Sequence, residues 1–161
     1  LGHNFFATDS GGKFTGCFLD VYPAEEVVGI GNTHLKTLLN EGSSVLRQAL
    51  LSMGLKSNYT GPIGIDAMLH RSVDGLVVLH PAIEINVRYT MGYVNLQMRK
   101  RLGGKIKGRW EIAQFNDGEW ACFCEEQMAQ NPLIVENGKA VKGFLPLLPP
   151  NSLFGAWMEI G

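Results

Sequence analysis

The sequence predicts an α+β fold in which an antiparallel β-sheet has helices packed on one face. The first observation is the order of its segments, which runs hairpin, helix, hairpin, helix and then several short strands. The second is composition. The chain has 161 residues, of which 45% are hydrophobic and 18% are charged, so it can bury a core of ordinary size. We therefore expect residues 1–161 to form a single domain.

The first element is a predicted β-hairpin over residues 4–21. Two β-prone runs flank the letters DSGG at 9–12, which are typical of a turn. The letters DSGGK at 9–13 lack the Gly-Lys-Ser/Thr spacing of a phosphate-binding loop, and a turn is the favoured interpretation.

The second element is a helix within residues 31–54, where leucines recur at helical spacing. Asn32 or Thr33 can cap its start, and Gly54 can end it. The letters EGSS at 41–44 are a weak point that can split this helix in two.

A second hairpin is predicted within residues 59–88, with its turn near 73–75. A helix follows, with Thr90 as a candidate N-cap and two glycines to stop it at 103–104. The remaining chain predicts short strands within 105–115, 132–137, 140–148 and 154–161, a turn at 136–139 and a short helix over 118–129.

The second hairpin separates polar from apolar residues by position. At positions 63–69 and 79–87 the odd-numbered residues are apolar, whereas the charged and polar side chains of these two stretches lie at even-numbered positions, including Asp66, Glu84, Asn86 and Arg88. If the turn centres on Asp74, residue 66 lies opposite residue 82 and diagonally across from Glu84, at roughly 7–8 Å. A slip of one residue in this register would turn Asp66 toward the core.

This polar face has the chemistry of a magnesium site. Two carboxylates and an amide oxygen form a hard, all-oxygen set of the kind that Mg²⁺ or Mn²⁺ prefers. Without a cation, Asp66 and Glu84 would repel each other, and one of the two would have a raised pKa. The guanidinium of Arg88 suits a phosphate or a carboxylate. The alternative stays open that this is an ordinary solvated sheet face with an Asp66–Arg88 ion pair.

The letters GPIGIDAML at 61–69 and AIEINVRYTMG at 82–92 resemble the metal-binding half of the ATP-grasp superfamily. Members of this superfamily have an acidic residue on one strand, a short turn and then Glu-x-Asn on the next strand. In the carboxylase and carbamoyl phosphate branches the pattern extends to Glu-x-Asn-x-Arg, which is Glu84 to Arg88 here. The resemblance covers about residues 60–102 well and the rest loosely.

The resemblance implies that Asp66, Glu84 and Asn86 hold the Mg²⁺ or Mn²⁺ ions that bridge the phosphates of ATP. It implies that Arg88 is a catalytic and ligand-binding residue that steadies an acyl phosphate or the acceptor. The function that it predicts is the metal- and ATP-phosphate-binding half of a ligase that joins a small-molecule carboxylate to an amine or a thiol. The superfamily's nucleotide-clamping N-terminal half is not found here, so we expect a C-terminal portion that is inactive alone and whose partner is that missing half. The alternative is a non-catalytic binding or regulatory module.

Charge and cysteine content narrow the remaining function classes. The net charge of −1 gives no basic field for nucleic acid or an anionic membrane, and the apolar runs are too short to span a bilayer. The three cysteines indicate reduced thiols and a cytoplasmic location, and the Cys122-x-Cys124 pair is a poor zinc site. His70 and His80 flank the hairpin turn on the carboxylate face, and solvated histidines are the favoured interpretation over a metal pair.

Overall fold

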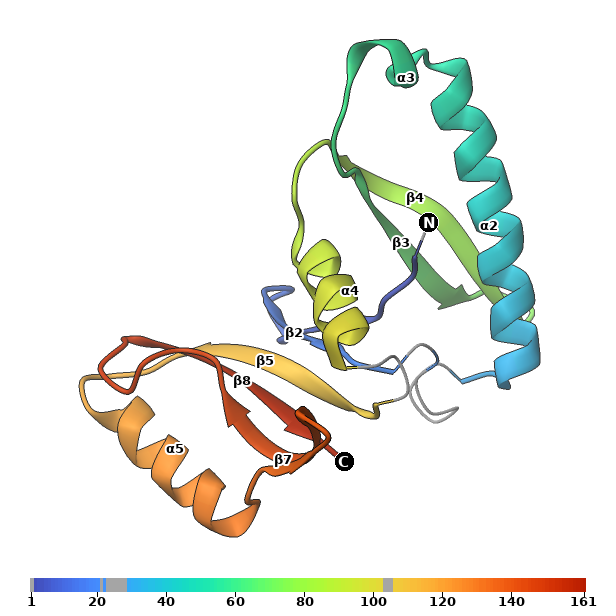
Figure 1. The fold of residues 1–161 in the computed structure, drawn as a ribbon. Helices are drawn as coiled ribbons and strands as arrows, with labels where there is room; N and C mark the ends of the chain where they lie inside the picture. The colour runs from blue at the N-terminus through green and yellow to red at the C-terminus, as the bar shows by residue number, and fades with distance from the viewer. Residues whose placement is uncertain (1, 21, 23–28, 103–105) are drawn as a thin grey trace. The chain divides into compact units, whose positions relative to one another are not determined.

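The computed structural model describes residues 2–20, 22, 29–102 and 106–161 (Figure 1). Within these residues the fold is α+β, with antiparallel strand pairing throughout, as predicted. The chain divides into two compact units, Leu1–His3 with Tyr22–Val94 and Asn4–Val21 with Asn95–Gly161. The described strands form two sheets rather than the expected single one, because the second hairpin pairs with no other strand in this part of the chain. That residues 1–161 form a single domain stays a prediction.

The second unit is built on a six-stranded sheet in the order β1-β2-β5-β8-β7-β6. The predicted first hairpin is its β1–β2 edge, and the predicted short strands supply the rest, paired in antiparallel register. The strands are β1 (Phe6–Thr8), β2 (Phe14–Phe18), β5 (Gly108–Gln114), β6 (Ile134–Glu136), β7 (Lys139–Pro146) and β8 (Phe154–Ile160).

Each face of this sheet has an apolar region that is covered by a helix. On one face Trp110 and Met158 are buried in a cluster against which Met98 and Leu102 of α4 (Met91–Leu102) pack. On the other face Trp157 packs with Trp120, Cys124 and Phe123 of α5 (Glu119–Gln130). The expectation of helices on one face is therefore wrong for this sheet, because the side of β5 and β8 opposite Trp110 also has an apolar part at Trp157 and Ala113, which α5 covers, beside the ion pairs of Arg109 with Glu111 and Glu159.

Two tight turns of the second unit form where the sequence indicated them. The Asp9 carboxylate accepts hydrogen bonds from the amides of Gly11 and Lys13, each at 2.9 Å, so these N–H groups belong to a turn, as predicted. At the second turn Asn137 and Gly138 have φ values of 49° and 74°, which are the left-handed values of a two-residue hairpin turn.

The first unit contains the second hairpin and the long helix that precedes it. The elements are α2 (Asn32–Ser52), α3 (Leu55–Asn58), β3 (Gly64–Arg71) and β4 (Val77–Asn86). The chain reverses between β3 and β4 at Ser72–Leu76, where Ser72 N–H donates to Leu76 O over 2.8 Å, and this confirms the expected turn. Helix α2 lies beside the hairpin, and α3 follows it directly (Figure 1).

Helix α2 runs unbroken through the expected weak point. Gly42 is buried, and a Cβ atom built on it would lie 2.5 Å from Leu79 Cδ2 and 3.8 Å from Pro81 Cβ. The glycine therefore lets the helix approach β4 closely, and the expectation of a split was wrong because packing on the hairpin outweighs the low helix propensity of glycine.

The helix ends that were predicted from the sequence are confirmed in part. Gly31 precedes α2 with no side-chain cap, so neither Asn32 nor Thr33 serves as the predicted cap. Gly54 follows the helix with φ 67°, as predicted for a terminating glycine. Thr90 caps α4 as predicted, since its Oγ1 accepts a hydrogen bond from Tyr93 N–H at 3.3 Å. The two glycines expected to stop α4 lie outside the described residues.

Two further sequence expectations concern membranes and thiols. None of the described helices is both long enough and apolar enough to cross a bilayer. Cys17, Cys122 and Cys124 are all free thiols, and burial raises the pKa of Cys17 to about 12. Cys17 and Cys124 are core residues of the second unit, which agrees with a packing role for them.

Candidate functional site

The predicted site residues lie together at one end of the β3–β4 hairpin. Asp66 is directly opposite Glu84. The next residue pair on the same face of the hairpin is Gly64 with Asn86. Directly opposed residues have Cβ atoms roughly 4.5–5.5 Å apart. The two carboxylates are therefore nearer neighbours than the diagonal arrangement expected from the turn.

The closer approach comes from an irregularity in the hairpin. Near the turn, Met68 faces His80 and Leu69 faces Leu79, which is the predicted register centred on Asp74. Between the Met68–His80 pair and the Asp66–Glu84 pair, β3 has one residue whereas β4 has three, so the register shifts by two. Pro81 lies in this segment and has no N–H to donate to the ladder, which is a physical reason for the break. A shift of two keeps each residue on its predicted face.

The two faces of the hairpin differ as the alternation predicted, but only in part. Leu79 and Pro81 lie under α2 at Gly42, so the odd-numbered positions near the turn are covered. Farther along β4 the same face is open, since Ile83 and Ile85 remain 56% and 44% exposed. The carboxylates occupy the opposite side of the strands from these isoleucines.

One hydrogen bond and two charges act on Asp66 within the site. Asn86 Nδ2 donates to Asp66 Oδ2 at 3.5 Å, and Asn86 itself is 8% exposed. Arg88 Nη1 donates to Tyr89 O at 3.4 Å, and the guanidinium is close enough to Asp66 to act on its charge. Among the described side chains no ion pair joins Asp66 to Arg88, so the ordinary ion-pair alternative lacks its expected contact.

Electrostatics at the site follow from this geometry. The pKa of Asp66 is raised above its ordinary value, first by burial, then by the negative charge of Glu84, with Arg88 acting in the opposite direction. One carboxylate of the pair therefore has a raised pKa, as predicted for two acids that face each other without a cation. Glu84 and Arg88 are exposed, so one side of the site is open to a ligand.

Sequence reasoning did not place Gly64 and Thr90 next to the site, although it predicted Thr90 as a helix cap. A Cβ on Gly64 would lie 2.5 Å from Thr90 Cγ2, so the chain leaving β4 folds tightly over the position opposite Asn86. Thr90 also caps α4, which ties Arg88 to the start of that helix. The signal was present in the sequence, because glycine inside a strand indicates a close approach by another segment.

The donor set matches a hard cation and differs from a transition-metal cluster. The described residues contain no group of three or more His, Cys, Asp and Glu side chains that could hold a metal ion. The candidate site instead offers two carboxylates and an amide, a set that suits Mg²⁺ when water and substrate oxygens complete the coordination.

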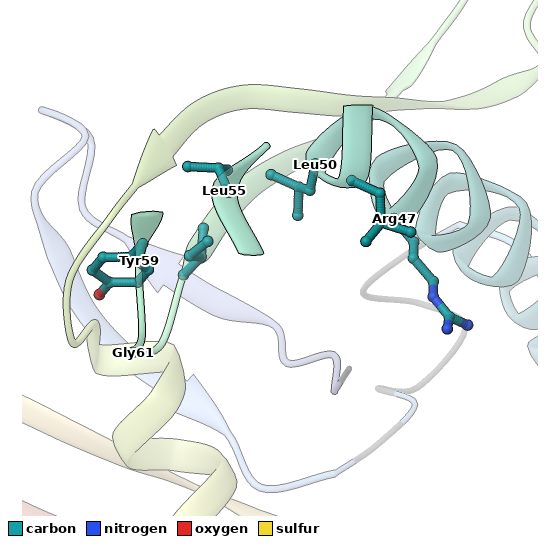
Figure 2. A pocket seen from close by; sticks show the side chains of 7 residues that line it. Arg47, Leu50, Leu55, Tyr59 and Gly61 are labelled. Carbon is teal, nitrogen blue, oxygen red and sulfur yellow. The ribbon is translucent and has the colours of Figure 1, made fainter. Parts of the chain in front are cut away.

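The described part of the first unit also has an apolar hollow at the end of α2 (Figure 2). Its volume is about 270 Å³. Figure 2 shows Leu50 of α2, Leu55 of α3 and Tyr59 around it, while the guanidinium of Arg47 extends away from it. The Tyr59 hydroxyl donates to Pro62 O at 2.9 Å, so its polar atom is already engaged.

Comparison of the chain with protein families, with curated proteins and with solved structures finds no match.

Proposed function

We propose that this chain is the metal- and phosphate-binding part of an ATP-dependent ligase that joins a carboxylate to an amine or a thiol through an acyl phosphate. The proposal extends to membership of the ATP-grasp superfamily and to a missing nucleotide-clamping half as the partner. The observation that carries it is the direct opposition of Asp66 and Glu84 with Asn86 beside them. The letters that resemble the superfamily are therefore the letters that converge in space.

The arrangement fits a divalent cation on physical grounds. Burial raises the pKa of Asp66, and the negative charge of the facing Glu84 adds to that rise. A cation between them would remove that repulsion, and all-oxygen ligation is what Mg²⁺ and Mn²⁺ prefer. Asp66, Glu84 and Asn86 would hold the ion, and a bound ion would neutralise negative charge on a transferring phosphoryl group.

The residues of the chain would contribute position and charge. Asn86 is nearly buried and is held against Asp66, so it fixes the direction of one donor. Arg88 is exposed beside the carboxylates, and its guanidinium is suited to a phosphate or a carboxylate of the substrate. Positioning and charge neutralisation are the main sources of catalysis in phosphoryl transfer.

A non-catalytic binding or regulatory module is the second candidate. It is favoured by the open apolar part of the hairpin, where Ile83 and Ile85 are half exposed, because such a surface is typical of an interaction site. The two candidates differ in what the metal site does. A ligase needs the cation for phosphoryl transfer, whereas a module needs only the surface.

The test measures Mn²⁺ binding by electron paramagnetic resonance, with and without ATP. We expect Glu84→Gln and Asp66→Asn each to weaken Mn²⁺ binding at least about tenfold, since each removes a direct ligand. Glu136→Gln, an exposed acid of the second unit, is the matched control and should bind as the natural chain does.

The same variants would then be placed in the protein completed with a nucleotide-clamping half. There Glu84→Gln should abolish most acceptor-dependent ATP hydrolysis, and unchanged turnover would refute the ligase. Full Mn²⁺ binding in the Glu84 and Asp66 variants would refute the metal site.

A further inference from the structure

A second group of potential metal ligands lies on the hairpin near its turn. Met68 of β3 is directly opposite His80 of β4, and His70 is the next residue of β3 on the same face. The pairing is regular here, running from Met68–His80 to Arg71–Val77 without a shift. His70 and His80 are therefore diagonal neighbours, and Met68 stands beside both.

This cluster faces away from α2. Leu79, which precedes His80, lies against the helix at Gly42, so the neighbouring positions on each strand point to the other side. All three side chains are accessible, with Met68 48% exposed and both histidines exposed. In the described residues neither imidazole is engaged in a hydrogen bond or an ion pair.

The spacing is within the reach of one metal ion. Directly opposed residues have Cβ atoms roughly 4.5–5.5 Å apart, and diagonal neighbours are separated by roughly 7–8 Å, which long side chains can span. The remaining position of this face between the histidines is Val78, opposite His70, which offers no competing donor. The candidate ligands are thus two imidazoles and one thioether.

The ligand types select the metal. Imidazole suits copper, nickel and zinc, whereas a thioether is a soft ligand that favours Cu(I). The hard oxygen ligands of Asp66 and Glu84 lie beyond the register shift and favour a different class of cation. We infer that Met68, His70 and His80 form a Cu(I) site that is separate from the carboxylate site.

The test is anaerobic Cu(I) titration against a chromophoric Cu(I) chelator in a Cys122→Ser background. That background is needed because the exposed Cys122 thiol is itself a Cu(I) ligand. We expect one Cu(I) per chain, with at least about tenfold weaker binding in His80→Ala, His70→Ala and Met68→Leu, since each loses a direct ligand. His34→Ala and Met128→Leu, both exposed elsewhere, are the matched controls and should bind unchanged.

A parallel titration with Ni²⁺ separates the roles of the ligands. The two histidine variants should weaken Ni²⁺ binding, while Met68→Leu should leave it unchanged, because a thioether contributes little to a borderline ion. The inference would be overturned if Met68→Leu bound Cu(I) as tightly as its Cys122→Ser parent does. It would equally be overturned if the two histidine variants did so. Asp66→Asn should not change Cu(I) binding, so failure here and failure of the carboxylate site are distinguishable.

Discussion

Asp66 shows how a single residue takes its properties from the segment across the hairpin. Its strand position alone predicts an ordinary solvated carboxylate on a polar face. In the structure Glu84 is directly opposite, Asn86 donates to its Oδ2, and burial with the charge of Glu84 raises its pKa. Burial and the opposing carboxylate therefore distinguish Asp66 from an ordinary surface aspartate.

The raised pKa predicts a pH-dependent stability in the absence of metal. The folded state binds the Asp66 proton more tightly than the unfolded chain does, so this group contributes stability below its ordinary pKa of 3.8. That contribution is lost as the pH rises through the raised folded-state pKa. Asp66→Asn has no proton to lose, so its free energy of unfolding relative to the natural chain should increase from below pH 3.8 toward neutrality.

Urea unfolding in chelator across this pH range measures the effect. Asp74→Asn, which changes an exposed carboxylate in the turn, is the control. A difference between Asp66→Asn and the natural chain that is constant with pH would contradict the prediction. Under the proposed function, added Mg²⁺ at neutral pH should stabilise the natural chain and leave Asp66→Asn unchanged.

At the scale of elements, helix α2 and the hairpin depend on one close approach. Gly42 brings the helix against Leu79 and Pro81, and this contact covers the odd-numbered face of the hairpin near its turn. The same contact orients the opposite face, where the histidines and Met68 lie. An isolated two-stranded hairpin is marginally stable in water, so the helix supports both candidate sites.

Gly42→Leu should therefore destabilise the first unit. The added side chain would overlap Leu79, because even a Cβ atom on residue 42 lies 2.5 Å from Leu79 Cδ2. Overpacking of this kind lowers the free energy of unfolding by about 1–3 kcal/mol. Ser44→Leu, at an exposed position two residues away on the same helix, should change stability by about 0.5 kcal/mol or less. Urea unfolding followed by circular dichroism at helical wavelengths compares the two. Equal stability in both variants would show that the helix does not need this approach.

At the scale of the whole molecule, the two compact units have separate sets of core residues. The described cores of the second unit include Trp110, Trp120 and Trp157, and none of these residues belongs to the first unit. The first unit instead holds the hairpin, α2 and both candidate sites. Units with separate cores can open separately, at different free energies.

Hydrogen exchange with mass spectrometry can detect such separate opening. Trp120→Ala should cost about 3–5 kcal/mol, and in moderate urea it should speed exchange in β5, α5, β7 and β8 while α2, β3 and β4 stay protected. Gly42→Leu is the reciprocal variant and should give the reverse pattern. Uniform acceleration across the chain by either variant would instead show the single cooperative domain that composition predicts.

The local structure was predictable where short-range physics decides it. The hairpin turns at Asp9 and Asn137, the cap at Thr90 and the terminating Gly54 each depend on a few neighbouring residues. The prediction failed at Gly42, where propensity favours a break and contact with β4 keeps the helix whole.

The order of residues was enough to predict which side chains of the second hairpin share a face, because side chains alternate with a period of two and a register shift of two preserves the sides. It was also enough to predict the α+β class and the oxygen-bearing side chains on that face. The direct opposition of Asp66 and Glu84, the separate sheet of the hairpin and the helices on both faces of the larger sheet became visible only in three dimensions. The physical reason is that strand pairing and layer packing join residues far apart in the chain, and no local pattern records which partner they meet.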